Sequence, residues 1–175
     1  MYNLLYTIVA SILLLSCAAQ RNSNQNNVKV FAYRQPVLQG VNPITITDDK
    51  GNTESVVKER SNYFIYIESP SPDIKVQEVW VRKVQYAAST ENVSNTPVLM
   101  LTSIMPNAKP DTLVQRTANK VLQVTLESGA APGKLSSWLQ KRINEHELVM
   151  RCVVDGKEHY YAVKAIKNLP PVALQ

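Results

Sequence analysis

The sequence predicts a mainly β fold, an immunoglobulin-like antiparallel β-sandwich of about seven to nine strands with one short α-helix. Short segments rich in β-branched and aromatic residues recur along the chain, and Pro, Gly, Asn or Asp closes each of them. In only one stretch do the apolar residues change from a spacing of two to a helical spacing. Such short, regularly interrupted strands are typical of one sandwich domain, which we place at residues 28–175.

The first three predicted strands lie between Val28 and Glu59. Val28 to Gln35 alternates small apolar side chains with larger ones, and Pro36 should end this strand or place it at a sheet edge. Asn42 to Thr47 and Glu54 to Glu59 flank a loop with two aspartates and a glycine, which predicts a hairpin. The two aspartates are too few for a calcium loop, so we interpret them as turn residues.

The middle of the chain supplies the most apolar segment. Ser61 to Glu68 is apolar on both faces, which predicts a central strand buried between two layers. Residues 69–73 contain two prolines and should form a turn. Val76 to Ala88 alternates over a length that suggests one strand bent by a bulge, and Pro97 to Met105 supplies another strand.

Two further segments are expected to pair with each other. Thr112 to Arg116 and Lys120 to Glu127 flank the polar residues 117–119. In the second segment Leu122, Val124 and Leu126 should face the core, because alternate residues of a strand share a face.

A single helix is predicted from Lys134 to Glu145. Leu135, Trp138, Leu139 and Ile143 fall at i, i+3, i+4 and i+8, the spacing of an amphipathic helix. We expect the helix to pack against the open end of the sandwich. A position on a lipid surface is the alternative, since several side chains of the helix are basic.

The C-terminal hairpin has the strongest local signal. Asp155-Gly156 lies between two alternating apolar runs, which predicts a two-residue turn and fixes the register. Residues 169–171, Leu-Pro-Pro, are expected to end the sheet. The predicted pairs are Val154 with Lys157, Val153 with Glu158, Cys152 with His159, Arg151 with Tyr160, and Met150 with Tyr161.

This register separates a core face from a solvated face. The solvated face carries Arg151 and Tyr160, with Glu158 and Lys164 beyond them, and Arg151 and Tyr160 are the surface residues that we select as binding candidates. The core face is predicted to contain Leu148, Met150, Cys152, Val154, His159, Tyr161, Val163 and Ala165.

The N-terminus carries a second kind of signal. The run from Leu4 to Leu15 is apolar and has the length of the h-region of a secretory signal, about 7–15 residues, too short to cross a bilayer. Leu14-Leu15-Ser16-Cys17 resembles the lipobox of bacterial lipoproteins. The resemblance implies a signal peptide at residues 1–16, and acylation of Cys17 with attachment to a lipid bilayer. Cleavage after Ala19 without lipidation and an uncleaved membrane anchor are the alternatives.

Residues 17–27 are polar and rich in Asn and Gln, so we interpret them as a flexible tether. Surface-exposed lipoproteins of the Bacteroidota often carry acidic residues directly after the cysteine, and this tether has none. The resemblance therefore favours the periplasmic face of the outer membrane.

Catalytic signatures are absent from the sequence. It has no GxSxG, no CxxC and no glycine-rich phosphate loop, and its two histidines exclude a histidine-rich metal site. A reactive pair of Cys152 and His159 and a spatially assembled carboxylate pair are the enzymatic alternatives. The net charge of +5 comes from scattered Lys and Arg, a distribution that argues against nucleic-acid binding. We expect that the protein is not an enzyme and that it binds no cofactor and no metal ion.

These observations favour a non-catalytic, lipid-anchored accessory or interaction subunit of a bacterial envelope complex, with another envelope protein as its partner. One alternative is a small carbohydrate- or peptide-binding lipoprotein that stacks ligands on Tyr160, Tyr33 or Trp80. Another is a fimbria-like adhesion subunit that works by strand addition, which would require an open groove or a mobile edge strand.

Overall fold

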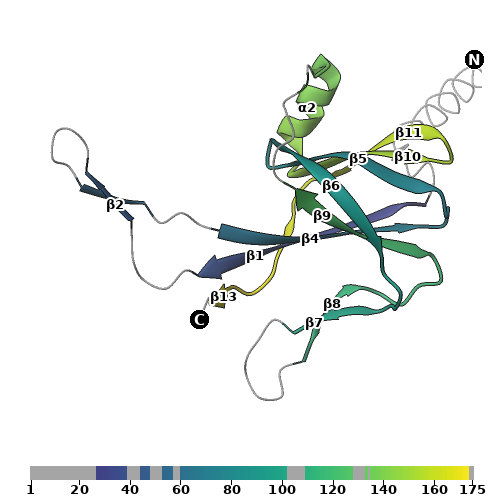
Figure 1. Cartoon of the computed structure of the whole chain (residues 1–175), viewed down its shortest axis with the longest axis horizontal. Helices are drawn as coiled ribbons and strands as arrows, with labels where there is room; N and C mark the ends of the chain where they lie inside the picture. Colours follow the sequence, from purple (N-terminus) through teal and green to yellow (C-terminus); the bar gives the residue numbers. More distant parts are fainter. Residues whose placement is uncertain are drawn as a thin grey trace, which may run out of the picture.

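The computed structural model describes residues 27–38, 44–47, 53–56, 60–101, 109–127, 133 and 135–173. Within these residues it confirms a mainly β, sandwich-like fold with one short helix (Figure 1). The helix is α2 (Ser137–Glu145). The strands are β1 (Lys29–Leu38), β2 (Ile44–Thr47), β3 (Thr53–Val56), β4 (Arg60–Ser69), β5 (Ile74–Val81), β6 (Val84–Asn92), β7 (Val98–Met100), β8 (Asp111–Val114), β9 (Lys120–Glu127), β10 (Leu148–Val154), β11 (Lys157–Val163), β12 (Lys167–Asn168) and β13 (Val172–Ala173).

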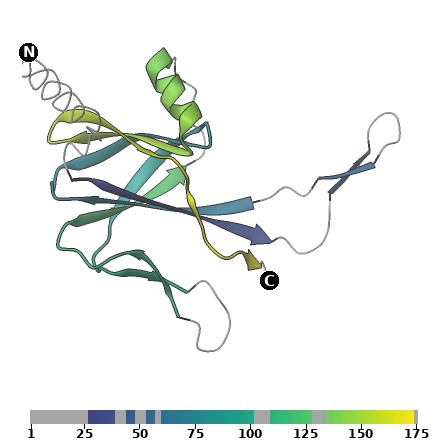
Figure 2. The ribbon, with the colours of Figure 1, turned by 180° about the vertical axis from the view of Figure 1, so that it is seen from behind.

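One curled sheet forms both layers. Its strand order is β11-β10-β5-β6-β9-β4-β1-β12, and β13 also pairs with β1. Strand β6 belongs to both layers, because residues 84–86 pair with β5 and residues 87–92 pair with β9. The sheet therefore turns at β6, and the β11-β10-β5 layer folds over the β9-β4-β1 layer, as Figure 2 shows from behind.

Among the described residues, apolar side chains fill three regions around this sheet. The main core lies between the layers, and β4 contributes Ile65 and Ile67 to it with no exposed surface. A second cluster lies where the hairpin of β7 and β8 covers the outer face of β1, β4 and β9. A third lies between α2 and the outer face of β5 and β10. The helix thus covers a sheet face, and the prediction that it packs against the open end is wrong.

The predicted single strand from Val76 to Ala88 is also wrong. It forms the hairpin of β5 and β6, with Arg82 and Lys83 as its two-residue turn. Both residues have positive φ, at 48° and 72°. Neither is a residue type that favours this conformation, so the turn gave no sequence signal. The pairing of the flanking strands imposes it.

Three other boundaries and pairings differ from the predictions. Strand β1 continues past Pro36, which lies opposite Ser61 in the ladder with β4. Strands β8 and β9 do not pair with each other: β8 pairs with β7, while β9 pairs with β4 and β6. The sheet does not end at residues 169–171, because β12 and β13 both pair in parallel with β1.

The C-terminal hairpin is confirmed, including every predicted pair. Its turn has positive φ at Asp155 (50°) and Gly156 (74°). The core face is confirmed for the residues of β10, but Ala165 lies beyond the end of β11 and is exposed. The predicted hairpin of β2 and β3 is confirmed too, with Ile44 opposite Val56. The signal peptide, nearly all of the tether, residues 48–52 and Lys134 lie outside the described residues.

Candidate functional site

Arg151 lies at the centre of a charged ladder on the outer face of β5, β10 and β11. Its Nε is 2.7 Å from Glu78 Oε2, and its Nη1 donates to Glu158 Oε1 at 2.6 Å. The hydrogen bond to Glu158 and the charge of Glu78 raise the pKa of the guanidinium. The Arg151 guanidinium is thus already paired with two carboxylates, so its most evident role is to stabilise the sheet.

Tyr160 has a different environment. Its ring makes an edge contact with Trp138, with centroids 5.1 Å apart and an interplanar angle of 81°. The Arg142 guanidinium lies 5.4 Å from the centroid of the Trp138 ring, and its Nη2 donates to the Tyr160 carbonyl at 3.4 Å. Trp138 remains 52% exposed. We call this group the Trp138–Arg142–Tyr160 surface.

The helix holds this surface in place. Ser136 caps its N-terminus, where the hydroxyl accepts a hydrogen bond from Leu139 N at 3.3 Å. Leu139 and Ile143 are buried against Trp80 and Val149 of the sheet below. The exposed ring of Trp138 therefore lies on a helix that is packed against the sheet.

The sequence identified Tyr160 but not its two neighbours on the helix. Trp138 belongs to the apolar stripe that predicted the helix, so it was expected to be covered. The structure places it at the margin of that stripe, beside Arg142 and over Tyr160. The i, i+4 spacing of Trp138 and Arg142 was the available signal, because residues at this spacing touch on a helix surface.

The other two aromatic candidates for ligand stacking are not accessible. Trp80 is 2% exposed beneath the helix. Tyr33 is buried in the second cluster, where its hydroxyl donates to the Leu113 carbonyl at 2.6 Å. The prediction that Trp80 or Tyr33 offers an exposed ring for stacking is therefore wrong, and Tyr160 is the remaining candidate of the three.

Cys152 and His159 are opposite each other in the ladder, as predicted. Cys152 has no exposed surface, and burial raises the pKa of its thiol to about 12. A nucleophilic cysteine needs a thiolate near neutral pH, and this environment disfavours it. Cys152 is a core residue.

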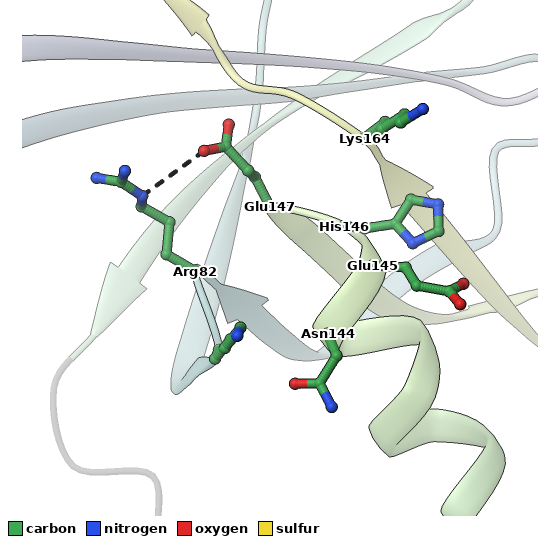
Figure 3. A pocket seen from close by; sticks show the side chains of 7 residues that line it. Arg82, Asn144, Glu145, His146, Glu147 and Lys164 are labelled. Atoms are coloured by element: carbon green, nitrogen blue, oxygen red, sulfur yellow. Dashed lines mark ion pairs between the residues drawn. The ribbon is translucent and has the colours of Figure 1, made fainter.

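A small cleft of about 200 Å³ lies at the C-terminal end of α2 (Figure 3). Its lining residues are Arg82, Lys83, Asn144, Glu145, His146, Glu147 and Lys164. His146 Nδ1 is 2.9 Å from the Arg142 carbonyl, within hydrogen-bond distance.

Glu147 connects three segments around this cleft. Its carbonyl accepts from Arg82 N at 2.7 Å, its amide donates to the Lys164 carbonyl at 3.3 Å, and its carboxylate accepts from Ile166 N at 2.7 Å. The carboxylate also lies 3.7 Å from Arg82 Nε (Figure 3). These contacts show that Glu147 holds the three segments together. The side chains around the cleft carry both positive and negative charges.

Within the described residues, no group of three or more His, Cys, Asp or Glu side chains is arranged to hold a metal ion. No helix in the same ranges is long and apolar enough to cross a membrane. Comparison of the chain with protein-family models, curated proteins and solved structures finds no match.

Proposed function

We propose that this protein is a lipid-anchored, non-catalytic subunit of a bacterial envelope complex, bound to its partner through the Trp138–Arg142–Tyr160 surface. The observation that carries the proposal is the half-exposed Trp138 ring, held between Tyr160 and Arg142 on a capped helix. Trp, Tyr and Arg are the residues most enriched at the energetic centres of protein interfaces. Their pre-ordered arrangement reduces the entropy lost on binding.

The anchor is proposed from Leu14-Leu15-Ser16-Cys17 and the apolar run before it. Two or three acyl chains on Cys17 would give lasting attachment, since each buried CH₂ contributes about 0.8 kcal/mol. The absence of acidic residues after Cys17 supports the periplasmic face of the outer membrane. Intact mass after detergent extraction tests this part: a chain that begins at Gln20 without added lipid mass contradicts it.

The partner contact is tested by affinity purification from gently solubilised membranes, with the stoichiometry of co-purified proteins measured. Trp138→Ala should reduce recovery of the partner at least about tenfold, because a residue at an interface centre contributes roughly 2 kcal/mol or more. Gln140→Ala is the matched control, since Gln140 is exposed on the same helix and lies outside the surface.

Both variants should keep the unfolding midpoint of the parent protein within a few degrees, because neither side chain is buried. Recovery of the parent only as a free monomer would contradict the proposal. If Trp138→Ala recovers a stoichiometric partner as well as the parent protein does, the contact lies on another surface.

A further inference from the structure

The pairing between β4 and β9 stops partway along both strands. Their ladder ends at the pair Ile65 and Val124. Among the described strands, β4 then pairs only with β1 back to Arg60, and β9 pairs only with β6 as far as Glu127. The two strands diverge into a fork, and Figure 1 shows the ribbon of β1 and β4 continuing where β9 turns away.

The fork is a consequence of the curl in the sheet. Because residues 87–92 of β6 pair with β9, the end of β9 follows β6 toward the β5 layer. The start of β4 stays with β1 instead. The strands must therefore separate where the layers separate, and the opening belongs to the architecture of the fold.

Both sides of the fork present strand edges without a neighbouring strand in the described part of the chain. The edge of β4 comprises residues 60–64, and the edge of β9 comprises residues 125–127. Alternate residues of a strand direct their N–H and C=O to the same side, so the β4 edge offers roughly two or three such residues. An unpaired edge of this kind is a template for another strand.

The fork contains a groove of about 380 Å³. The half-buried side chains of Tyr63, Tyr86 and Leu126 form its apolar wall and pack against the main core. All the lining residues are uncharged, so the groove suits an uncharged extended segment with apolar side chains. The remaining lining residues are Ser61, Asn62, Phe64, Gln123, Val124 and Thr125.

The opposite edge of the same ribbon is covered. Strands β12 and β13 pair in parallel with β1 at Tyr33 and Val37, and Leu169 N donates to the Arg34 carbonyl at 2.8 Å. The chain thus adds its own C-terminal segment to the β1 edge, and within the described residues it adds none to the facing β4 edge.

We propose that the fork accepts an extended segment of a partner protein, which adds to β4 as an antiparallel strand. Strands β4 and β9 are antiparallel, so one inserted strand cannot be antiparallel to both. The longer free edge, that of β4, decides the direction. The inserted residue opposite Tyr63 then shares its face and is apolar, because cross-strand neighbours lie on one side of a sheet. This site is separate from the Trp138–Arg142–Tyr160 surface.

The test uses the full-length protein in detergent micelles and a capped seven-residue peptide of alternating valine and threonine as the probe. Amide hydrogen exchange is followed by mass spectrometry. At saturating peptide, exchange in residues 60–64 and 125–127 should slow at least tenfold. N-methyl groups on alternate peptide residues remove the donors along one edge. Two such peptides are used, one with N-methyl groups on the valines and one with N-methyl groups on the threonines. At least one of them should not slow the amide exchange.

A pair of variants locates the site. Leu126→Glu places a charge on the apolar wall and should abolish the slowing, while Ser89→Glu, at an exposed position on the neighbouring strand, should preserve it. Unfolding midpoints establish that both variants are folded. Equal protection by the parent and Leu126→Glu would overturn the assignment, as would equal protection by both methylated peptides.

Three other results would overturn the proposal. Exchange of residues 60–64 in the free protein as slow as that of residues 65–68 would mean that this chain already fills the fork. A concentration-dependent dimer with the same amides protected would assign the fork to a second copy. No slowing at peptide concentrations up to about 1 mM, the range of weak complexes, would remove strand addition. None of these results affects the test with Trp138→Ala.

Discussion

Glu68 shows how a single residue can hold a loop to the sheet. It is 4% exposed, yet its carboxylate accepts hydrogen bonds from Asn119 Nδ2 at 2.7 Å, Thr117 Oγ1 at 2.9 Å and Lys29 Nζ at 3.3 Å. Burial by itself raises the pKa of Glu68, but the hydrogen bonds from Asn119, Thr117 and Lys29 outweigh it and lower the pKa. The sequence showed only a glutamate near the end of a strand.

This arrangement predicts acid sensitivity. A carboxylate whose pKa is lower in the folded state stabilises the fold above its unfolded pKa, about 4.3, and the contribution is lost as the pH falls through the folded pKa. Glu68→Gln should lower the free energy of unfolding at pH 7 by about 1–3 kcal/mol and flatten its decline below pH about 4.5. Denaturant titrations across this pH range measure both effects.

Glu91→Gln is the control for Glu68→Gln, because Glu91 is exposed on β6. It should retain the acid dependence of the parent protein. An equally steep acid decline in Glu68→Gln would show that other carboxylates cause it.

At the scale of elements, two hairpins use the same turn with different residues. The turn of β5 and β6 has φ of 48° and 72° at Arg82 and Lys83, and the turn of β10 and β11 has 50° and 74° at Asp155 and Gly156. Asp-Gly favours positive φ, whereas Arg-Lys does not. For this reason the sequence predicts each residue pair of the β10–β11 hairpin. For the β5–β6 hairpin it suggests one continuous strand instead.

Exchanging residues between these turns gives opposite predictions. Lys83→Gly relieves a strained backbone and should raise the free energy of unfolding by up to about 1 kcal/mol. Gly156→Lys should lower it by about 1–2 kcal/mol. A Cβ at Gly156 meets nothing within 4 Å, so the loss would come from the backbone alone. Guanidinium denaturation of both variants checks the signs, and a destabilised Lys83→Gly would contradict the strain argument.

At the scale of the whole molecule, the C-terminal segment protects the edge of the sheet. Leu169 is 5% exposed, and Gln35 Nε2 donates to the Pro170 carbonyl at 3.2 Å. The sequence predicted an end to the sheet here, because proline rarely continues a strand. Parallel pairing on one edge tolerates these prolines, since only one side of the segment must pair.

A chain that stops after Ile166 therefore loses β12 and β13. We expect its free energy of unfolding to fall by at least about 2 kcal/mol, from the lost burial of Leu169 and the lost hydrogen bonds. The bared β1 edge should also promote concentration-dependent self-association, which sedimentation velocity measures. A chain that stops after Ala173 is the control and should match the parent. An unchanged, monomeric short form would show that the segment does not protect the edge.

The candidate surface was predictable only in part. Tyr160 was found because the Asp155-Gly156 turn fixes which face of β11 it occupies. Trp138 and Arg142 were missed because a helical spacing defines a stripe but not its margins against a particular sheet. Tyr33 and Trp80 were expected to be accessible, and they are buried because β7, β8 and α2 cover the outer faces of the sheet.

The sequence alone determined most strand positions, the helix, the central place of β4 and the register of the last hairpin. These properties depend on alternation and turn chemistry within a few residues of each other. Only the tertiary structure decided the partners of β9, the cover on the β1 edge, the Trp138–Arg142–Tyr160 surface and the fork. Pairing between distant segments depends on how completely the whole chain can bury its apolar faces, and local spacing does not encode that choice.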